Sequence, residues 1–72
     1  KLKEAELFTR KAIELKPNSA DAHYSLGIIL RDLSKLKEAE SSIRKAIELN
    51  PNLLEAYTSL GKILQKIEES TS

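Results

Sequence analysis

The feature of this sequence that most constrains its fold is an internal repeat with a period of 34 residues. The hexapeptide KLKEAE stands at residues 1–6 and again at 35–40, and aligning residues 1–34 with 35–68 gives 20 identical pairs out of 34. Self-similarity at a fixed period of this length is typical of proteins built from stacked structural units. We therefore expect one structural unit to occur twice along the chain.

Each period carries the pattern of two amphipathic helices. In residues 36–49, apolar side chains recur at helical spacing: Leu36, Ala39, Ile43, Ala46, Ile47 and Leu49. Pro51 ends this helix, because proline lacks a backbone donor and disfavours helical geometry in the residue before it. The next helix is expected at 54–68, with one apolar face that consists of Leu54, Tyr57, Leu60, Gly61, Leu64 and Ile67. The earlier copy predicts helices at 1–16 and 20–33.

Two finer expectations concern the helix starts and the helix contacts. Asn18 and Asn52, each followed three residues later by an acid, are predicted to cap the helices that begin after them. A glycine in mid-helix costs about 0.5–1 kcal/mol relative to alanine. Because Gly27 and Gly61 occupy matching positions in the two copies, we expect a neighbouring helix backbone to pass close to each of them.

Composition and charge exclude several classes of function. Twelve basic and 11 acidic residues are interspersed along the chain, so there is no basic surface for nucleic acid and no polybasic strip for a membrane. The longest apolar run, residues 28–30, is far shorter than the roughly 20 residues of a membrane span. With no cysteine and one histidine, the chain has no zinc site, and it contains neither a calcium loop nor a glycine-rich phosphate loop. We expect a soluble all-α protein without a cofactor, with a cytoplasmic location as the default.

Residues of the types found in hydrolytic triads occur close together at Asp21, His23 and Ser25. At about 100° per residue, Asp21 and Ser25 share one helix face while His23 points roughly the opposite way. A triad needs its base and nucleophile within hydrogen-bond reach, and the second copy has Tyr57 in place of the histidine. We therefore expect no enzymatic activity, and His23 to be a packed or half-buried side chain.

The chain resembles the tetratricopeptide repeat (TPR) family over residues 1–68. The resemblance rests on the 34-residue period, on the pairs Leu26-Gly27 and Leu60-Gly61, and on alanines and prolines at fixed places, namely Ala5, Ala12, Ala39, Ala46, Pro17 and Pro51. It implies antiparallel helix-turn-helix repeats stacked as a right-handed α-solenoid. Each repeat of the family has a first helix, A, and a second helix, B, and the four helices here follow the order B-A-B-A.

In the frame of this family the chain begins in mid-repeat. Residues 1–72 would form one domain in which 1–16 is the second helix of a partial repeat and 20–53 is a complete repeat. Residues 54–68 would be the first helix of the next repeat, followed by a tail at 69–72. The phase is that of a piece cut from a longer array.

The resemblance implies protein–protein interaction, because the A helices of this family line a concave groove that holds a peptide or protein segment. The matching positions are Asp21, Tyr24, Ser25, Ile28, Arg31, Asp32, Glu55, Thr58, Ser59, Lys62, Gln65 and Lys66. Basic residues near the helix ends favour a partner with an acidic segment; the alternative is that these charges only solvate the surface and favour the helix dipole. The family's clamp for the carboxyl terminus of chaperones is not expected, because its positions hold Tyr24, Ile28, Thr58 and Ser59.

Self-association is the alternative function. Repeat arrays generally need about three units, because each unit buries its apolar face only against a neighbour. The first and last helices here would lack a hairpin mate, so we expect copies to stack head-to-tail or to form a closed dimer; the remaining alternative is a monomer with frayed terminal helices. The residues predicted to make this contact are Leu2, Ala5, Phe8, Ala12, Ile13, Leu60, Ile63, Leu64 and Ile67.

Overall fold

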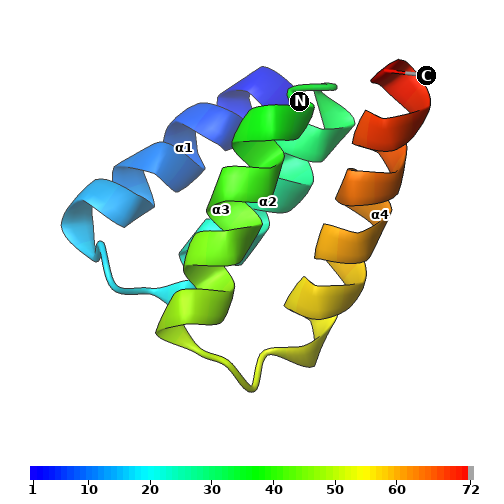
Figure 1. Ribbon diagram of the computed structural model, residues 1–72. Coiled ribbons are helices and arrows are strands. Elements are labelled where there is room, and N and C mark those ends of the chain that lie inside the picture. The colour runs from blue at the N-terminus through cyan, green and yellow to red at the C-terminus, as the bar shows by residue number, and fades with distance from the viewer. Residues whose placement is uncertain (72) are drawn as a thin grey trace.

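The computed structural model describes residues 1–71 and shows four antiparallel α-helices (Figure 1). They are α1 (Leu2–Leu15), α2 (Ala20–Asp32), α3 (Leu36–Leu49) and α4 (Leu54–Thr71). Within these residues no strand occurs, so the predicted all-α class is confirmed. Helix α4 continues three residues beyond the predicted end at 68, so residues 69–71 extend the helix and are not a tail; residue 72 lies outside the described residues.

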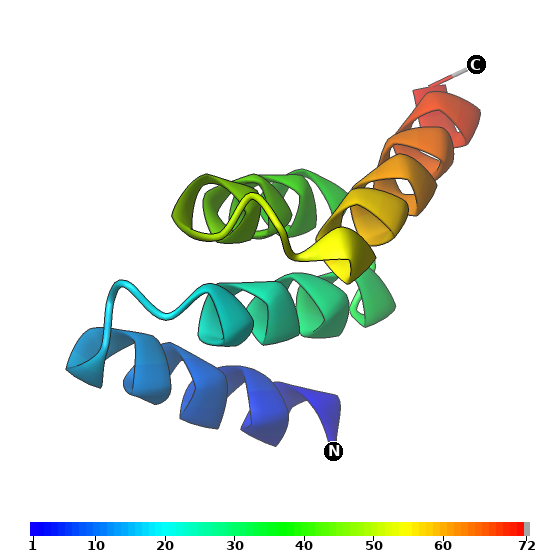
Figure 2. The ribbon, with the colours of Figure 1, turned by 90° about the horizontal axis from the view of Figure 1, so that it is seen from below.

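The helices lie side by side in a flat arrangement of 39 × 29 × 14 Å. Helix α2 lies between α1 and α3, and α4 packs mainly against α3 (Figure 2). The pairing of α2 with α3 is the most extensive contact of the fold, and the contact between α2 and α4 is the smallest. A groove can therefore open between α2 and α4.

The core lies where α2, α3 and α4 meet. It consists of the buried residues Leu26, Leu30, Ala39, Ile43, Ala56 and Ile63. The expected close approach is present at Gly27, where an added Cβ would lie 2.6 Å from Cγ1 of Ile43 and 3.4 Å from the Ala39 carbonyl oxygen. At Gly61 the same expectation is wrong, because no atom lies within 4 Å of the place where a Cβ would stand.

Helix α4 buries a different face from the one that its apolar pattern predicts. Its buried residues are Ala56, Ser59 and Ile63. The predicted stripe is largely left in solvent: Leu54, Tyr57, Gly61 and Leu64 are exposed, and only Leu60 and Ile67 pack against the core. The reason is that α4 packs mainly on α3. In α2 the equivalent of the predicted stripe faces α3, whereas no helix covers this stripe in α4.

The predicted asparagine caps are also wrong. Helix α2 begins at Ala20, and the side chain of Ser19 accepts a hydrogen bond from the Ala22 amide at 3.2 Å. In the turn between α3 and α4, the side-chain oxygen of Asn50 accepts a hydrogen bond from the Asn52 amide at 3.1 Å. Each helix begins one residue later than an Asn18 or Asn52 cap requires, so these asparagines do not stand at the cap position.

Ser34 closes the α2–α3 turn with φ of 65°. The Lys35 amide donates to the Leu30 carbonyl at 2.8 Å and the Ser34 amide donates to the Arg31 carbonyl at 2.9 Å. These two bonds are the Schellman pattern, which satisfies carbonyls at a helix end and favours glycine at the residue with positive φ. A serine therefore occupies a position at which glycine would avoid strain.

A charged cluster connects α1 to α3. Glu6 accepts from Arg10 at 2.9 Å and from Lys35 at 3.4 Å, and Arg10 also contacts Glu38 at 3.3 Å. The hydrogen bond from Arg10, with the nearby Lys35 charge, lowers the pKa of the Glu6 carboxyl. Exposed pairs of this kind contribute little stability each, so the cluster adds little to the stability of the fold.

Candidate functional site

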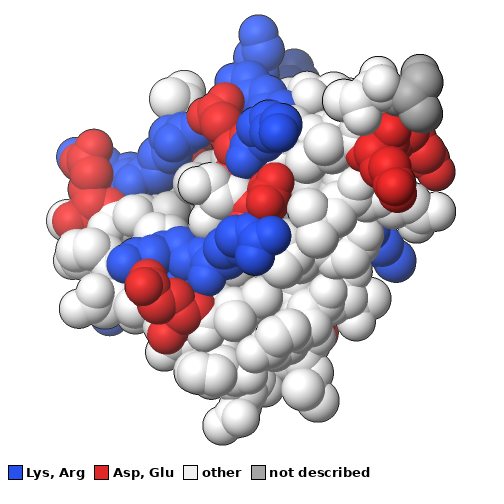
Figure 3. Space-filling model, viewed as in Figure 1, with Lys and Arg blue, Asp and Glu red and all other residues white. Residues whose placement is uncertain are grey.

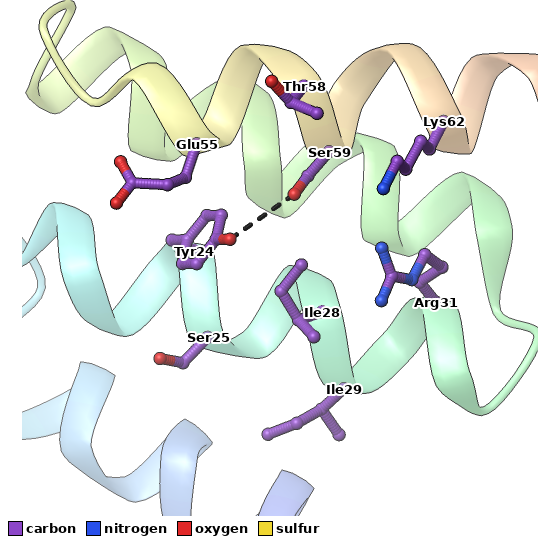
Figure 4. A pocket seen from close by; sticks show the side chains of 9 residues that line it. All are labelled: Tyr24, Ser25, Ile28, Ile29, Arg31, Glu55, Thr58, Ser59 and Lys62. Carbon is purple, nitrogen blue, oxygen red and sulfur yellow. Dashed lines mark hydrogen bonds between the residues drawn. The ribbon is translucent and has the colours of Figure 1, made fainter.

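A groove of about 670 Å³ lies between α2 and α4 (Figure 4). Its lining residues are Tyr24, Ser25, Ile28, Ile29, Arg31, Glu55, Thr58, Ser59 and Lys62. Tyr24, Ile28 and Arg31 point from α2 toward α4, because positions three and four apart share one face of a helix, whereas Ser25 and Ile29 point away from α4 (Figure 4). The groove therefore exists only through the tertiary pairing of two helices that are not adjacent in sequence.

The floor of the groove is apolar with one polar contact. Tyr24 and Ile28 pack partly against the core. Ser59 is 6% exposed, and its hydroxyl donates to the Tyr24 hydroxyl at 3.5 Å, which joins the two walls. A side chain of a partner that enters here would meet the Tyr24 ring and the Ile28 side chain, which favour apolar groups.

The charges at the two ends of the groove differ in sign. Arg31 and Lys62 approach each other from opposite walls at one end, and Glu55 lies toward the other end beside Tyr24 (Figure 4). Among the described residues, Arg31 forms an ion pair only with its neighbour Asp32, at 3.5 Å. No ion pair within residues 1–71 involves Lys62 or Lys66. The basic end thus has cationic groups available to a ligand.

The structure brings together most of the residues predicted for a binding groove. Those that line it are Tyr24, Ser25, Ile28, Arg31, Glu55, Thr58, Ser59 and Lys62. Gln65, Lys66 and Asp32 line an adjoining hollow of about 460 Å³ that shares Arg31 and Lys62 with the groove. Asp21 is exposed at the start of α2 and lines neither.

Ile29 also lines the groove and was not predicted there. In the repeat alignment it matches Ile63, which is fully buried. An isoleucine that recurs at the same position in both copies indicates a core residue in both. The sequence therefore holds no signal that would have assigned Ile29 to a surface.

A second hollow, of about 560 Å³, lies between α1 and α3 over α2 and includes His23, Ser41 and Ser42. The His23 Nε2 lies 2.9 Å from the Pro17 carbonyl oxygen, and the Tyr57 hydroxyl donates to the Pro51 carbonyl at 2.9 Å. The two residues therefore fix the turn before their helix in the same way. Ser25 lines the α2–α4 groove, so His23 and Ser25 belong to different hollows.

The residues predicted for self-association differ in burial. Ile63 is fully buried in the core, so its side chain cannot contact a second copy, which corrects the expectation for that residue. The half-buried members of the set are Ala5, Ile13, Leu60 and Ile67. The exposed members are Leu2, Phe8, Ala12 and Leu64.

Neither a membrane segment nor a metal cluster is found within residues 1–71. None of the four helices combines the length and the apolar composition needed to cross a bilayer. No three His, Asp or Glu side chains of these residues gather where they could hold a metal ion.

Comparison with known protein families identifies one segment of the chain. The family model described as tetratricopeptide repeat matches residues 20–53, which comprise α2, α3 and the turns that follow them. The search of curated proteins found no match. Tetratricopeptide repeats generally mediate protein–protein interactions and are generally non-catalytic. Residues 20–53 therefore form a tetratricopeptide repeat.

Proposed function

We propose that the groove between α2 and α4 binds an extended segment of a protein partner. The observation that carries this proposal is the arrangement of an apolar floor, Tyr24 and Ile28, next to the converging cations of Arg31 and Lys62. An apolar floor supplies affinity through burial, and a small number of placed charges supplies orientation.

The partner that fits this groove is a segment with an apolar side chain followed by acidic residues. The apolar side chain would lie on Tyr24 and Ile28, and the acids would lie against Arg31, Lys62 and Lys66. Glu55 at the other end repels acids, so the segment would bind in one direction. Arginine forms bidentate contacts with carboxylates, which makes Arg31 the orienting contact.

Reversing the charge at Lys62 is expected to weaken binding of an acidic peptide about fivefold, because the substitution removes one attraction and adds one repulsion, which together amount to roughly 1 kcal/mol. The probe is a labelled decapeptide with one central leucine and three carboxy-terminal glutamates, and the measurement is fluorescence anisotropy with Lys62→Glu and the unchanged chain.

The matched control is Lys37→Glu, which makes the same charge change on α3 outside the groove. Equal affinities of the Lys62→Glu and Lys37→Glu variants for the peptide would refute the proposed site. A peptide that ends in three lysines serves as the ligand control and should bind more weakly than the acidic one.

Self-association is a second candidate function, supported by the large apolar side chains that the terminal helices leave in solvent. Phe8 on α1 is 72% exposed and Leu54 on α4 is 73% exposed. Burial of a side chain of this size contributes about 1.5–3 kcal/mol, so contact between copies is favourable. We expect the weight-average mass in sedimentation equilibrium to rise between low and high micromolar concentration, and a constant monomer mass over that range would exclude this function.

A further inference from the structure

The contact between α2 and α3 shows what a complete hairpin of this chain looks like. Three residues of α3, namely Ala39, Ile43 and Ala46, are fully buried. Ile43 lies against Gly27, where its Cδ1 and Cγ1 occupy the space that a Cβ would take. Leu26 and Leu30 of α2 complete this contact region. Gly27 is therefore required by the presence of Ile43.

Helix α4 presents the same face without a partner. Leu30 is 1% exposed, and its repeat equivalent Leu64 is 39% exposed. Gly27 is buried, and its equivalent Gly61 is exposed with nothing within 4 Å of an added Cβ. A mid-helix glycine destabilises the helix, so Gly61 has no structural explanation within residues 1–71.

Helix α1 presents the other half of the contact. Its sequence matches that of α3 except at Leu7, Phe8 and Thr9. The equivalents of the three buried α3 residues are Ala5 and Thr9, which are half-buried, and Ala12, which is exposed. The equivalents of the two halves of the α2–α3 contact thus lie on α4 and α1 of one chain, the first largely exposed and the second partly covered.

The exposed surfaces of α1 and α4 also match in chemistry. In Figure 3 the surface over α4 is almost free of charged side chains, apart from acids near its carboxyl end. The α1–α3 hollow is lined by His23 and Ser42, among others. Their repeat equivalents are Tyr57, which is 47% exposed, and Phe8. If α1 of a second copy lay on α4 as α3 lies on α2, Phe8 would face Tyr57, and the joint would be more apolar than the contact inside the chain.

We infer that α1 of a second copy docks on α4 in the register of α3 on α2, with Thr9 seated over Gly61. This inference rests on the self-association proposed above and specifies its geometry. The contact joins two different surfaces, so it is heterologous, and a stack of any length keeps one free α1 surface and one free α4 surface. Residues 1–68 span two periods, so each added copy continues the 34-residue stride. The product is an open head-to-tail stack of copies, and a closed symmetric dimer is not formed.

The register is tested by Gly61→Ala. A methyl group at residue 61 meets empty space in the single chain, so the variant is expected to melt at a higher temperature at low concentration. In the stack the same methyl group would collide with the γ atoms of Thr9, as a Cβ at Gly27 would collide with Cγ1 of Ile43. We expect the dissociation constant for self-association to rise at least about tenfold.

The double variant Thr9→Ala/Gly61→Ala identifies the partner residue. Alanine at residue 9 has no γ atoms, so the double variant is expected to recover most of the lost association in sedimentation equilibrium. Association that is unaffected by Gly61→Ala, or weakened without recovery by Thr9→Ala, overturns the register while self-association itself stands. A monomer at every concentration of the unchanged chain instead removes self-association and the register together.

Crosslinking separates the open stack from a symmetric dimer. The chain has no cysteine, so Phe8→Cys and Tyr57→Cys give two variants with one thiol each. With a short bismaleimide, the head-to-tail contact is expected to give a crosslinked dimer in an equal mixture of the two variants and little in either alone. Crosslinking within one variant alone, without an increase in the mixture, would overturn the inference.

Discussion

Ile43→Ala is expected to lower the free energy of unfolding by about 2–5 kcal/mol, which is a large fraction of the 5–15 kcal/mol available to a whole domain. Ile43 is fully buried and belongs to the one core of the described residues. Its removal leaves a cavity between α2 and α3 that the fully buried Ala39 and Ala46 are too small to fill. The measurement is urea unfolding followed by far-ultraviolet circular dichroism, with dilute protein so that association does not contribute.

The matched control is Thr9→Ala, at the equivalent position of α1. Thr9 is half-buried and the residues on either side of it in the chain, Phe8 and Arg10, are exposed, so this change is expected to cost no more than about 0.5 kcal/mol. Equal losses for the two variants would mean that the α2–α3 contact does not dominate stability. An unfolding midpoint that falls far more in Ile43→Ala than in Thr9→Ala is the expected pair of results.

Alanine at the two repeat-equivalent glycines is expected to change stability in opposite directions. At Gly27 the added methyl group overlaps the fully buried Ile43, and overpacking of this kind costs about 1–3 kcal/mol. That cost exceeds the roughly 0.5–1 kcal/mol gained by replacing a helical glycine. At Gly61 no atom is near, so Gly61→Ala keeps only the gain.

The same unfolding measurement compares both variants at low micromolar concentration. A gain in stability at Gly27 would show that Ile43 moves aside without cost, and a loss at Gly61 would show that a helix covers α4 in the dilute chain. The double variant Gly27→Ala/Ile43→Ala adds an internal check. Because the two substitutions share one space, the combined loss should be smaller than the sum of the single losses.

Variants at Gly61, Thr9 and Lys62 also separate the two proposed functions. Gly61 and Thr9 do not line the α2–α4 groove, so changes at these residues should leave binding of an acidic peptide unchanged in the dilute chain. Lys62 lines the groove, so Lys62→Glu should change peptide binding. A joint loss of both properties in one variant would indicate unfolding instead of a local effect.

The sequence predicted most of the residues that line the α2–α4 groove, and binding at this groove stays a prediction. Eight of the predicted groove residues line one cavity because the A-helix positions of a repeat family are set by helical spacing, which is a local property. Ile29 was missed and Asp21 was placed wrongly because lining depends on the tilt of α4 against α2. Helix tilt is decided by packing between side chains of different helices, and no local pattern encodes it.

By itself the sequence determined the number of helices, the prolines that end them and the 34-residue stride, since these depend on local backbone chemistry and on a pattern that recurs. The tertiary structure alone decided which copy of each pattern is buried. Burial differs between the repeat equivalents Gly27 and Gly61, and likewise between Ile43 and Thr9. The reason is that burial depends on whether a neighbouring helix is present. The helix starts were likewise decided by the turn, where Ser19 and not Asn18 reaches the free amide.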